Sequence, residues 1–215
     1  MVVRQARLTA RLLLATIAAL ACWSLLYFGP DHLLPPLRPR GAPQPVWQAA
    51  LLYPGLASCW TLACETALRL RRWRRNLARA GNVFATAWAG ALTLILAAQG
   101  TALADALGYK VDRSATLAAV IGLILLYRAN LLPKSRPAWF NGVALPVFAA
   151  SSDVWRRVHQ VSAFRLIAIG LAALALAVLK PAGVDPLPII GWLLAAELLL
   201  ASAHALWLGK RLHKA

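Results

Sequence analysis

The sequence predicts an all-α membrane protein, a polytopic bundle of six transmembrane helices with both termini in the cytoplasm. Apolar residues make up 60% of the 215 residues and charged residues only 14%, whereas soluble domains have about 45–50% and about 25%. The 23 Lys and Arg residues far outnumber the 7 Asp and Glu residues. This composition excludes intrinsic disorder and a cytosolic metabolic enzyme, and three cysteines are too few for a disulfide scaffold.

Six predominantly apolar runs give the predicted spans, of which the fifth contains Arg165 and the sixth contains Glu197. A membrane-spanning helix needs about 20 apolar residues because the hydrocarbon core is about 30 Å thick. The fourth run is short, but its Arg128 side chain can extend to the headgroups while the apolar residues continue to position 132. No run alternates over ten positions as a β-barrel strand would, so we expect helices. The runs are residues 12–28, 46–64, 80–104, 114–127 (continued to 132), 161–179 and 187–208.

The basic residues predict the orientation. Cytoplasmic connections of membrane proteins carry an excess of Lys and Arg. With the N-terminus inside, eighteen of the 23 basic residues lie on the cytoplasmic side. An alternative is that Arg4, Arg7 and Arg11, followed by an apolar stretch and Ala19-Leu20-Ala21, form a cleavable signal peptide. Because the apolar run continues to Phe28, we expect an uncleaved first helix.

Two connections in the N-terminal half have distinct compositions. The first outer connection, residues 29–45, is rich in proline and predicts a stiff extended segment. The second, residues 69–79, holds six arginines, with Leu70, Trp73 and Leu77 on one helical face. We expect an interfacial helix that binds anionic membrane lipids. A patch that binds nucleic acid or a repressor is the alternative, although direct contact with nucleic acid is not expected so close to the membrane.

The longest connection, residues 128–162, divides the chain into a predicted N-terminal part, residues 1–113, and a C-terminal part, residues 114–215. It contains Pro133 and Pro137, a turn at Asn141-Gly142 and a helix start near Ser152. Its sequence resembles the signature loop of the SdpI family, a family of bacterial integral membrane proteins. The matching positions are Asn130, Pro133, Phe140, Gly142, Pro146, Trp155 and His159.

The resemblance implies a function. SdpI-like proteins protect bacteria against their own membrane-active toxin, and some are thought to hold a repressor at the membrane. The resemblance therefore implies a multi-pass protein of the bacterial inner membrane that acts in toxin immunity or toxin-linked signal transduction, with a peptide toxin and a cytoplasmic repressor as partners. The centre of the motif differs, because Ala144-Leu145 and Val147-Phe148 stand where the family has Arg-Thr and Trp-Thr.

Glu197 is the costliest residue of the predicted spans. A carboxylate at the bilayer centre costs about 2.5–3.5 kcal/mol on insertion scales, so it should face the bundle interior. His204 follows seven residues later on the same helical face. The pair favours a small transporter or lipid-handling protein as the alternative function. A structural hydrogen bond from Glu197 to a serine, a threonine or a backbone carbonyl is the other interpretation.

The remaining polar residues have simpler interpretations. Glu65 is expected to pair with Arg69 at i+4, and Arg128 and Arg165 to extend toward the headgroups. Asn130 could cap a helix end or bind a peptide, and His159 is expected to pack within its loop rather than to bind metal. No catalytic motif is present in the sequence, so we expect no enzyme, cofactor or metal. A purely structural subunit of a larger membrane complex is a third possible role.

Overall fold

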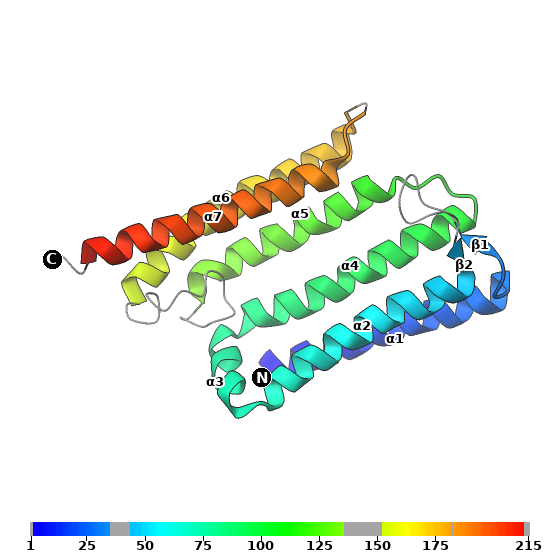
Figure 1. Cartoon of the computed structure of the whole chain (residues 1–215), viewed down its shortest axis with the longest axis horizontal. Helices are drawn as coiled ribbons and strands as arrows, with labels where there is room; N and C mark the ends of the chain where they lie inside the picture. Colours follow the sequence, from blue (N-terminus) through cyan, green and yellow to red (C-terminus); the bar gives the residue numbers. More distant parts are fainter. Residues whose placement is uncertain (1, 35–43, 136–151, 182, 213–215) are drawn as a thin grey trace.

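The structure is a computed structural model of the whole chain, and it describes residues 2–34, 44–135, 152–181 and 183–212. The described residues are almost entirely helical (Figure 1). Two short strands between the first two helices pair antiparallel, with Leu33 opposite Pro45. The elements are α1 (Val2–Phe28), β1 (Leu33–Leu34), β2 (Gln44–Pro45), α2 (Val46–Arg69), α3 (Arg71–Ala80), α4 (Asn82–Ala106), α5 (Arg113–Leu131), η1 (Leu132–Lys134), α6 (Ser152–Leu179) and α7 (Pro186–Leu212).

Five helices in the described part of the chain are long and apolar enough to cross a membrane: α1, α4, α5, α6 and α7. The chain is therefore a multi-pass membrane protein, and the predicted all-α class is confirmed. α2 has 24 residues, which is sufficient length, but it is not among these five, and its polar residues include Gln48, Thr61 and Glu65. The structure thus supports five of the six predicted spans by length and composition.

Most helices are longer than the apolar runs from which the sequence predicts them. α1 begins at Val2 and includes Arg4, Arg7 and Arg11, while α6 begins at Ser152, near the predicted helix start. The reason is physical: a charged residue leaves the hydrocarbon core but keeps its backbone hydrogen bonds, so the helix continues into the headgroup region. The arginine-rich segment forms α3, a separate helix with Leu77 buried and Leu70 and Trp73 exposed beside it.

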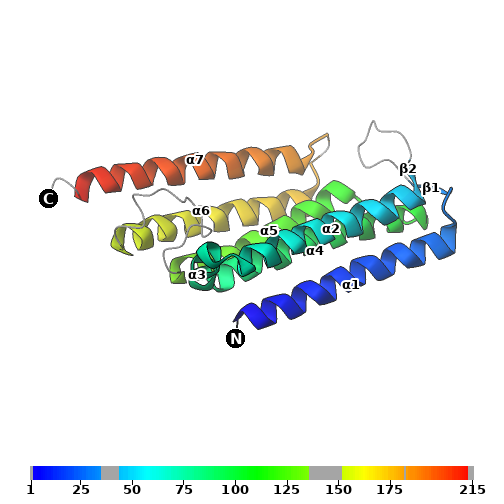
Figure 2. The same ribbon diagram turned by 60° about the horizontal axis from the view of Figure 1, so that its bottom comes forward.

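The six long helices that the structure describes pack in two groups of three: α1, α2 and α4 in one group, and α5, α6 and α7 in the other. Ile17 of α1, Tyr53 and Ala57 of α2, and Trp88 and Leu92 of α4 belong to one buried cluster. α5, α6 and α7 share two further clusters, and α4 contacts α5 to join the groups. α1 and α7 lie at opposite edges of the bundle (Figure 2). The boundary between the groups falls near residue 113, although separate domains remain a prediction.

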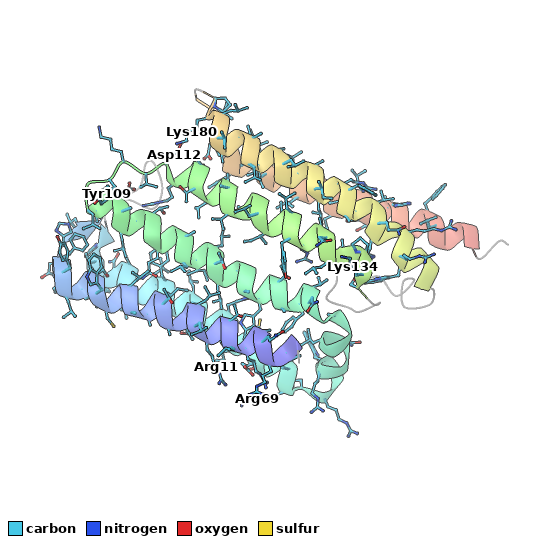
Figure 3. All side chains as sticks on the ribbon, turned by 180° about the vertical axis from the view of Figure 1, so that it is seen from behind. Arg11, Arg69, Tyr109, Asp112, Lys134 and Lys180 are labelled. Carbon is cyan, nitrogen blue, oxygen red and sulfur yellow. The ribbon has the colours of Figure 1, made fainter. Side chains whose placement is uncertain are left out.

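The connections alternate between the two ends of the bundle. The start of α1, α3, the end of α5, the start of α6 and the end of α7 lie at one end, which we call the basic end (Figure 1). Arg11, Arg69 and Lys134 lie there, and Tyr109, Asp112 and Lys180 lie at the opposite end (Figure 3). The described residues on either side of the signature loop's centre, up to residue 135 and from residue 152, therefore lie at the same end of the molecule as the arginine-rich helix.

Polar contacts at the opposite end hold three helices together. The Asp112 carboxylate caps α5 by accepting a hydrogen bond from the Ala115 amide at 2.9 Å, and the Lys180 Nζ lies 3.7 Å from it. Ser114 of α5 donates a hydrogen bond to Asp185, which precedes α7. Because Lys180 follows α6, these contacts connect α5 to both neighbours in its group.

α5 and α6 approach closely where two glycines face each other. A Cβ added at Gly122 would lie 2.8 Å from the carbonyl oxygen of Gly170, and one added at Gly170 would lie 3.0 Å from that of Gly122. Small residues allow such approach between membrane helices, whose association depends on close packing. Here the backbone itself occupies the space that a side chain would need.

We predict that Gly122→Ala destabilises the protein by about 1–3 kcal/mol, because the added methyl group must push two helix backbones apart. Gly100→Ala in α4 is the matched control, since nothing lies within 4 Å of a Cβ at that position. The free energy of unfolding of the purified proteins should be measured in one detergent. Equal stability of the two variants would contradict the proposed close approach.

Candidate functional site

Glu197 is the most deeply buried charged residue in the described part of the chain, and only 6% of it is exposed. It lies near the middle of α7 and meets two side chains of α6. The Ser162 hydroxyl donates a hydrogen bond to Glu197 Oε1, and Arg165 Nη1 lies 3.2 Å from Glu197 Oε2. The carboxylate therefore has both a neutral donor and a cation, which together offset the cost of taking it out of water.

The partners of Glu197 follow from the geometry of α6. Ser162 and Arg165 are three residues apart, so they share one helical face, and this face contacts α7. The hydrogen bond from Ser162 agrees with the interpretation in which Glu197 forms a structural hydrogen bond to a serine of another helix. Arg165 differs from expectation: instead of extending to the headgroups, its guanidinium forms an ion pair with Glu197. Sequence reasoning identified neither Ser162 nor this pairing.

His204 does not join this cluster in the described structure. Its ring centre lies 6.3 Å from that of Trp207, and its buried Nδ1 has no hydrogen-bond partner. One face of α7 carries both residues, but the side chains that reach Glu197 come from α6. The predicted Glu197–His204 pair therefore has no direct contact among the residues described.

His159 and Trp155 form a second contact at the start of α6. Their rings stack with centres 3.8 Å apart, and His159 Nδ1 lies 2.8 Å from the carbonyl oxygen of Trp155. The Trp155 indole donates to the carbonyl oxygen of Ser135 at 3.2 Å. Both side chains are buried, so they fix the start of α6 against the segment that follows η1.

A pocket of about 300 Å³ joins these two contacts. This volume is at the lower limit of small-ligand sites, which span about 300–1,000 Å³. Leu198, which is more than half exposed, belongs to the lining, so the pocket reaches the outer surface of the bundle. Arg128, His159, Ser162 and Glu197 are its polar residues, and its apolar residues are Leu125, Leu132, Val158, Leu166, Leu194, Leu198 and Ala201.

The structure describes only some of the other matching positions of the signature loop. Asn130 is exposed at the end of α5, and its Oδ1 accepts a hydrogen bond from Lys134 Nζ at 3.2 Å. Pro133 lies in η1. Phe140, Gly142 and Pro146 lie outside the described residues. The structure thus brings His159, but not Asn130, into the pocket.

Glu65 has a different partner from the one predicted. Its Oε2 lies 2.9 Å from Arg7 Nη2 of α1, rather than pairing with Arg69 of its own helix. An i+4 neighbour is always within reach, but the antiparallel packing of α1 on α2 brings an arginine closer. Glu65 therefore connects two helices instead of stabilising one.

We predict that Arg165→Gln destabilises the protein more than Glu197→Gln does. The first change leaves a buried carboxylate without its cation, and the expected loss is about 1–3 kcal/mol. The second removes the charge but leaves an amide oxygen that can still accept a hydrogen bond from Ser162. The double variant should show a coupling energy of about 0.5–3 kcal/mol in a double-mutant cycle.

The exposed Arg157 of α6 supplies the control for this cycle, because Arg157→Gln changes the same kind of side chain on the same helix. Unfolding free energies should be compared in one detergent. If Arg157→Gln and Arg165→Gln have the same effect, or if the double variant is simply additive, the ion pair does not stabilise the bundle.

Comparison with protein-family models, with curated proteins and with solved structures finds no match to this chain. The resemblance to the SdpI family therefore rests on the residues of the signature loop alone. It stays a prediction, as do the activity and the partners that it implies.

Proposed function

We propose that the chain crosses the bacterial inner membrane six times, with α2 as the sixth span and both termini in the cytoplasm. α2 runs beside α1 and α4, and Tyr53 and Ala57 are buried against them. Eighteen of the 23 basic residues belong to the connections and termini assigned to the cytoplasm. The positive-inside rule then makes the basic end the cytoplasmic end.

We propose further that the protein acts in toxin immunity or toxin-linked signalling by binding a membrane-active peptide. The observation that supports this function is the shared pocket of His159 and Glu197. His159 belongs to the signature loop, while Glu197 is the buried carboxylate of α7, 38 positions further along the printed sequence. A ligand in this pocket would contact α5, α6 and α7 together, so its binding would change the packing of α6 against α7.

A change in the packing of α6 against α7 would also move the start of α6, at the proposed cytoplasmic end. Trp155 connects α6 to the segment after η1 through its hydrogen bond to Ser135, and the signature loop continues from there. A cytoplasmic partner protein, such as a repressor, would bind at this end. The basic side chains there favour a partner with an acidic surface.

The second candidate function is a small transporter or lipid-handling protein that uses Glu197 and His204. The observation that favours it is the pocket's lining, which includes exposed Leu198 together with an intramembrane carboxylate. A ligand could therefore enter from the lipid. The two candidates differ in the histidine that they require, since immunity depends on His159 and transport on His204.

The topology predicts which positions a membrane-impermeant maleimide can label in intact cells. With Cys22, Cys59 and Cys64 replaced by alanine, single cysteines at His32 and Arg71 flank α2. We expect labelling at position 32 from outside, and at position 71 only after permeabilisation. Labelling of both positions from the same side would show that α2 does not cross.

The immunity function predicts a specific pattern among pocket variants. A strain lacking the gene should be more sensitive to culture supernatant of its own parent, and the unaltered gene should restore resistance. His159→Ala and Glu197→Gln should lower the inhibitory supernatant concentration by about tenfold, because losing a charged hydrogen bond costs about 1.4 kcal/mol or more. His204→Ala should restore full resistance.

The result can also favour the second candidate. Unchanged sensitivity of the deletion strain would contradict the immunity function. If Glu197→Gln and His204→Ala impair solute flux into proteoliposomes while His159→Ala does not, the transporter is supported instead. Membrane levels of every variant should be matched by immunoblot before sensitivity is compared.

A further inference from the structure

The pocket between α5, α6 and α7 contains a positive charge for which the described residues supply no counter-charge. Arg128 of α5 lines it, and no hydrogen bond or ion pair to its guanidinium is found among the described residues. The nearby carboxylate does not serve this role, because Arg165 and Ser162 already hold Glu197. A lone cation in an apolar environment is unfavourable unless an anion accompanies it.

All the polar residues of the pocket lie toward the basic end, among the apolar residues Leu132, Val158 and Ala201, and only apolar residues line its innermost part. Arg128 lies three residues from the end of α5, and His159 lies in the second turn of α6. Leu125, Leu166 and Leu194 line the pocket about one helical turn or more further from this end. An occupant that satisfies the whole pocket therefore has an anionic head and an apolar body.

We propose that this pocket binds an anionic phospholipid of the inner leaflet. The phosphate accepts hydrogen bonds from the Arg128 guanidinium, whose planar fork suits phosphate oxygens. One acyl chain lies against Leu125, Leu166 and Leu194, and the lipid enters beside exposed Leu198. The proposal deepens the proposed function and rests on it for the assignment of the basic end to the cytoplasm.

Charge selects among the lipids of the membrane. A zwitterionic headgroup carries its own cation, so its phosphate competes for Arg128 with an internal partner. A net anionic headgroup offers an unpaired negative charge to an unpaired arginine. The depth of Arg128 near the end of a spanning helix also matches the level of the phosphates of one leaflet.

The test uses the purified full-length chain in a neutral detergent, with bound phosphatidylglycerol or phosphatidylcholine counted by native mass spectrometry. We expect phosphatidylglycerol to bind the unaltered protein at least about tenfold more tightly than phosphatidylcholine. Arg128→Gln should weaken phosphatidylglycerol binding by about tenfold, since one charge-assisted hydrogen bond is lost. Arg128→Lys keeps the charge and should lose less.

Arg11→Gln is the matched control, because Arg11 is an exposed arginine at the same end of the bundle but lies outside the pocket (Figure 3). This variant should bind phosphatidylglycerol as the unaltered protein does. Each variant must elute as the unaltered protein does in size-exclusion chromatography. If Arg128→Gln does not fold, Leu125→Trp, which fills the apolar part of the pocket, should cause the same loss of binding.

Three results would overturn the proposal: equal binding of the two lipids, equal loss in Arg11→Gln and Arg128→Gln, or displacement of phosphatidylglycerol by millimolar inorganic phosphate. The last result would assign Arg128 to free anions. Lipid binding is measured without toxin, so its failure leaves the immunity result standing. Conversely, a deletion strain of unchanged sensitivity would remove the immunity function and leave the lipid site intact.

Discussion

A buried carboxylate determines how the C-terminal helices of this protein pack. Glu197 lies near the middle of an apolar helix, where a charge is tolerated only with partners. α6 supplies those partners through Ser162 and Arg165. Apolar side chains alone would allow α6 and α7 to slide or rotate past each other, because lipid tails solvate leucines as well as another helix does. A charged pair at one position fixes both the rotation and the register of the two helices.

The same contact shapes the pocket. Arg165 of α6 neutralises Glu197, whereas Arg128, the arginine that lines the pocket, has no counter-charge among the residues that the structure describes. The pocket is thus lined both by Glu197, whose charge is paired, and by Arg128, for which the described residues supply no partner. His159 lines the pocket toward the basic end, and its stacking partner Trp155 connects it to Ser135, which follows η1. A ligand site, a helix–helix contact and the start of the signature loop therefore share one small region of the bundle.

The fold could be predicted from sequence because lipid imposes simple rules. Apolar runs of sufficient length predicted the helices. The unequal distribution of arginines predicted which helix ends lie on the same side of the bundle. Helix length and apolar length differ where charged residues continue a helix: α1 and α6 extend beyond their apolar runs. α2 is long enough to span but is not among the five helices that meet both the length and the composition of a span, so the sixth span stays a prediction.

The candidate site was less predictable. Glu197 could be singled out because its insertion is costly whatever surrounds it, and His159 because its loop resembles a known motif. The partners depend on how helices are rotated against each other, and local sequence does not encode this rotation. Sequence proximity therefore favoured Arg69 for Glu65, whereas packing placed Arg7 beside it. A polar pair three residues apart on α6, within the half of the helix nearer the basic end, was the available signal for Ser162 and Arg165.

The most direct measurement of the account is a solid-state NMR dipolar-recoupling experiment on the protein in lipid bilayers. The sequence has only two glutamates, Glu65 and Glu197. Glutamate labelled at its side-chain carboxyl carbon and arginine labelled at its guanidinium nitrogens therefore report only two sites. The two ion pairs should give two short carbon–nitrogen contacts, one of which disappears in Glu197→Gln while the Arg7–Glu65 contact remains as the internal reference. A spectrum in which only the Glu65 contact is present in the unaltered protein would contradict the ion pair on which this account of the bundle and its pocket depends.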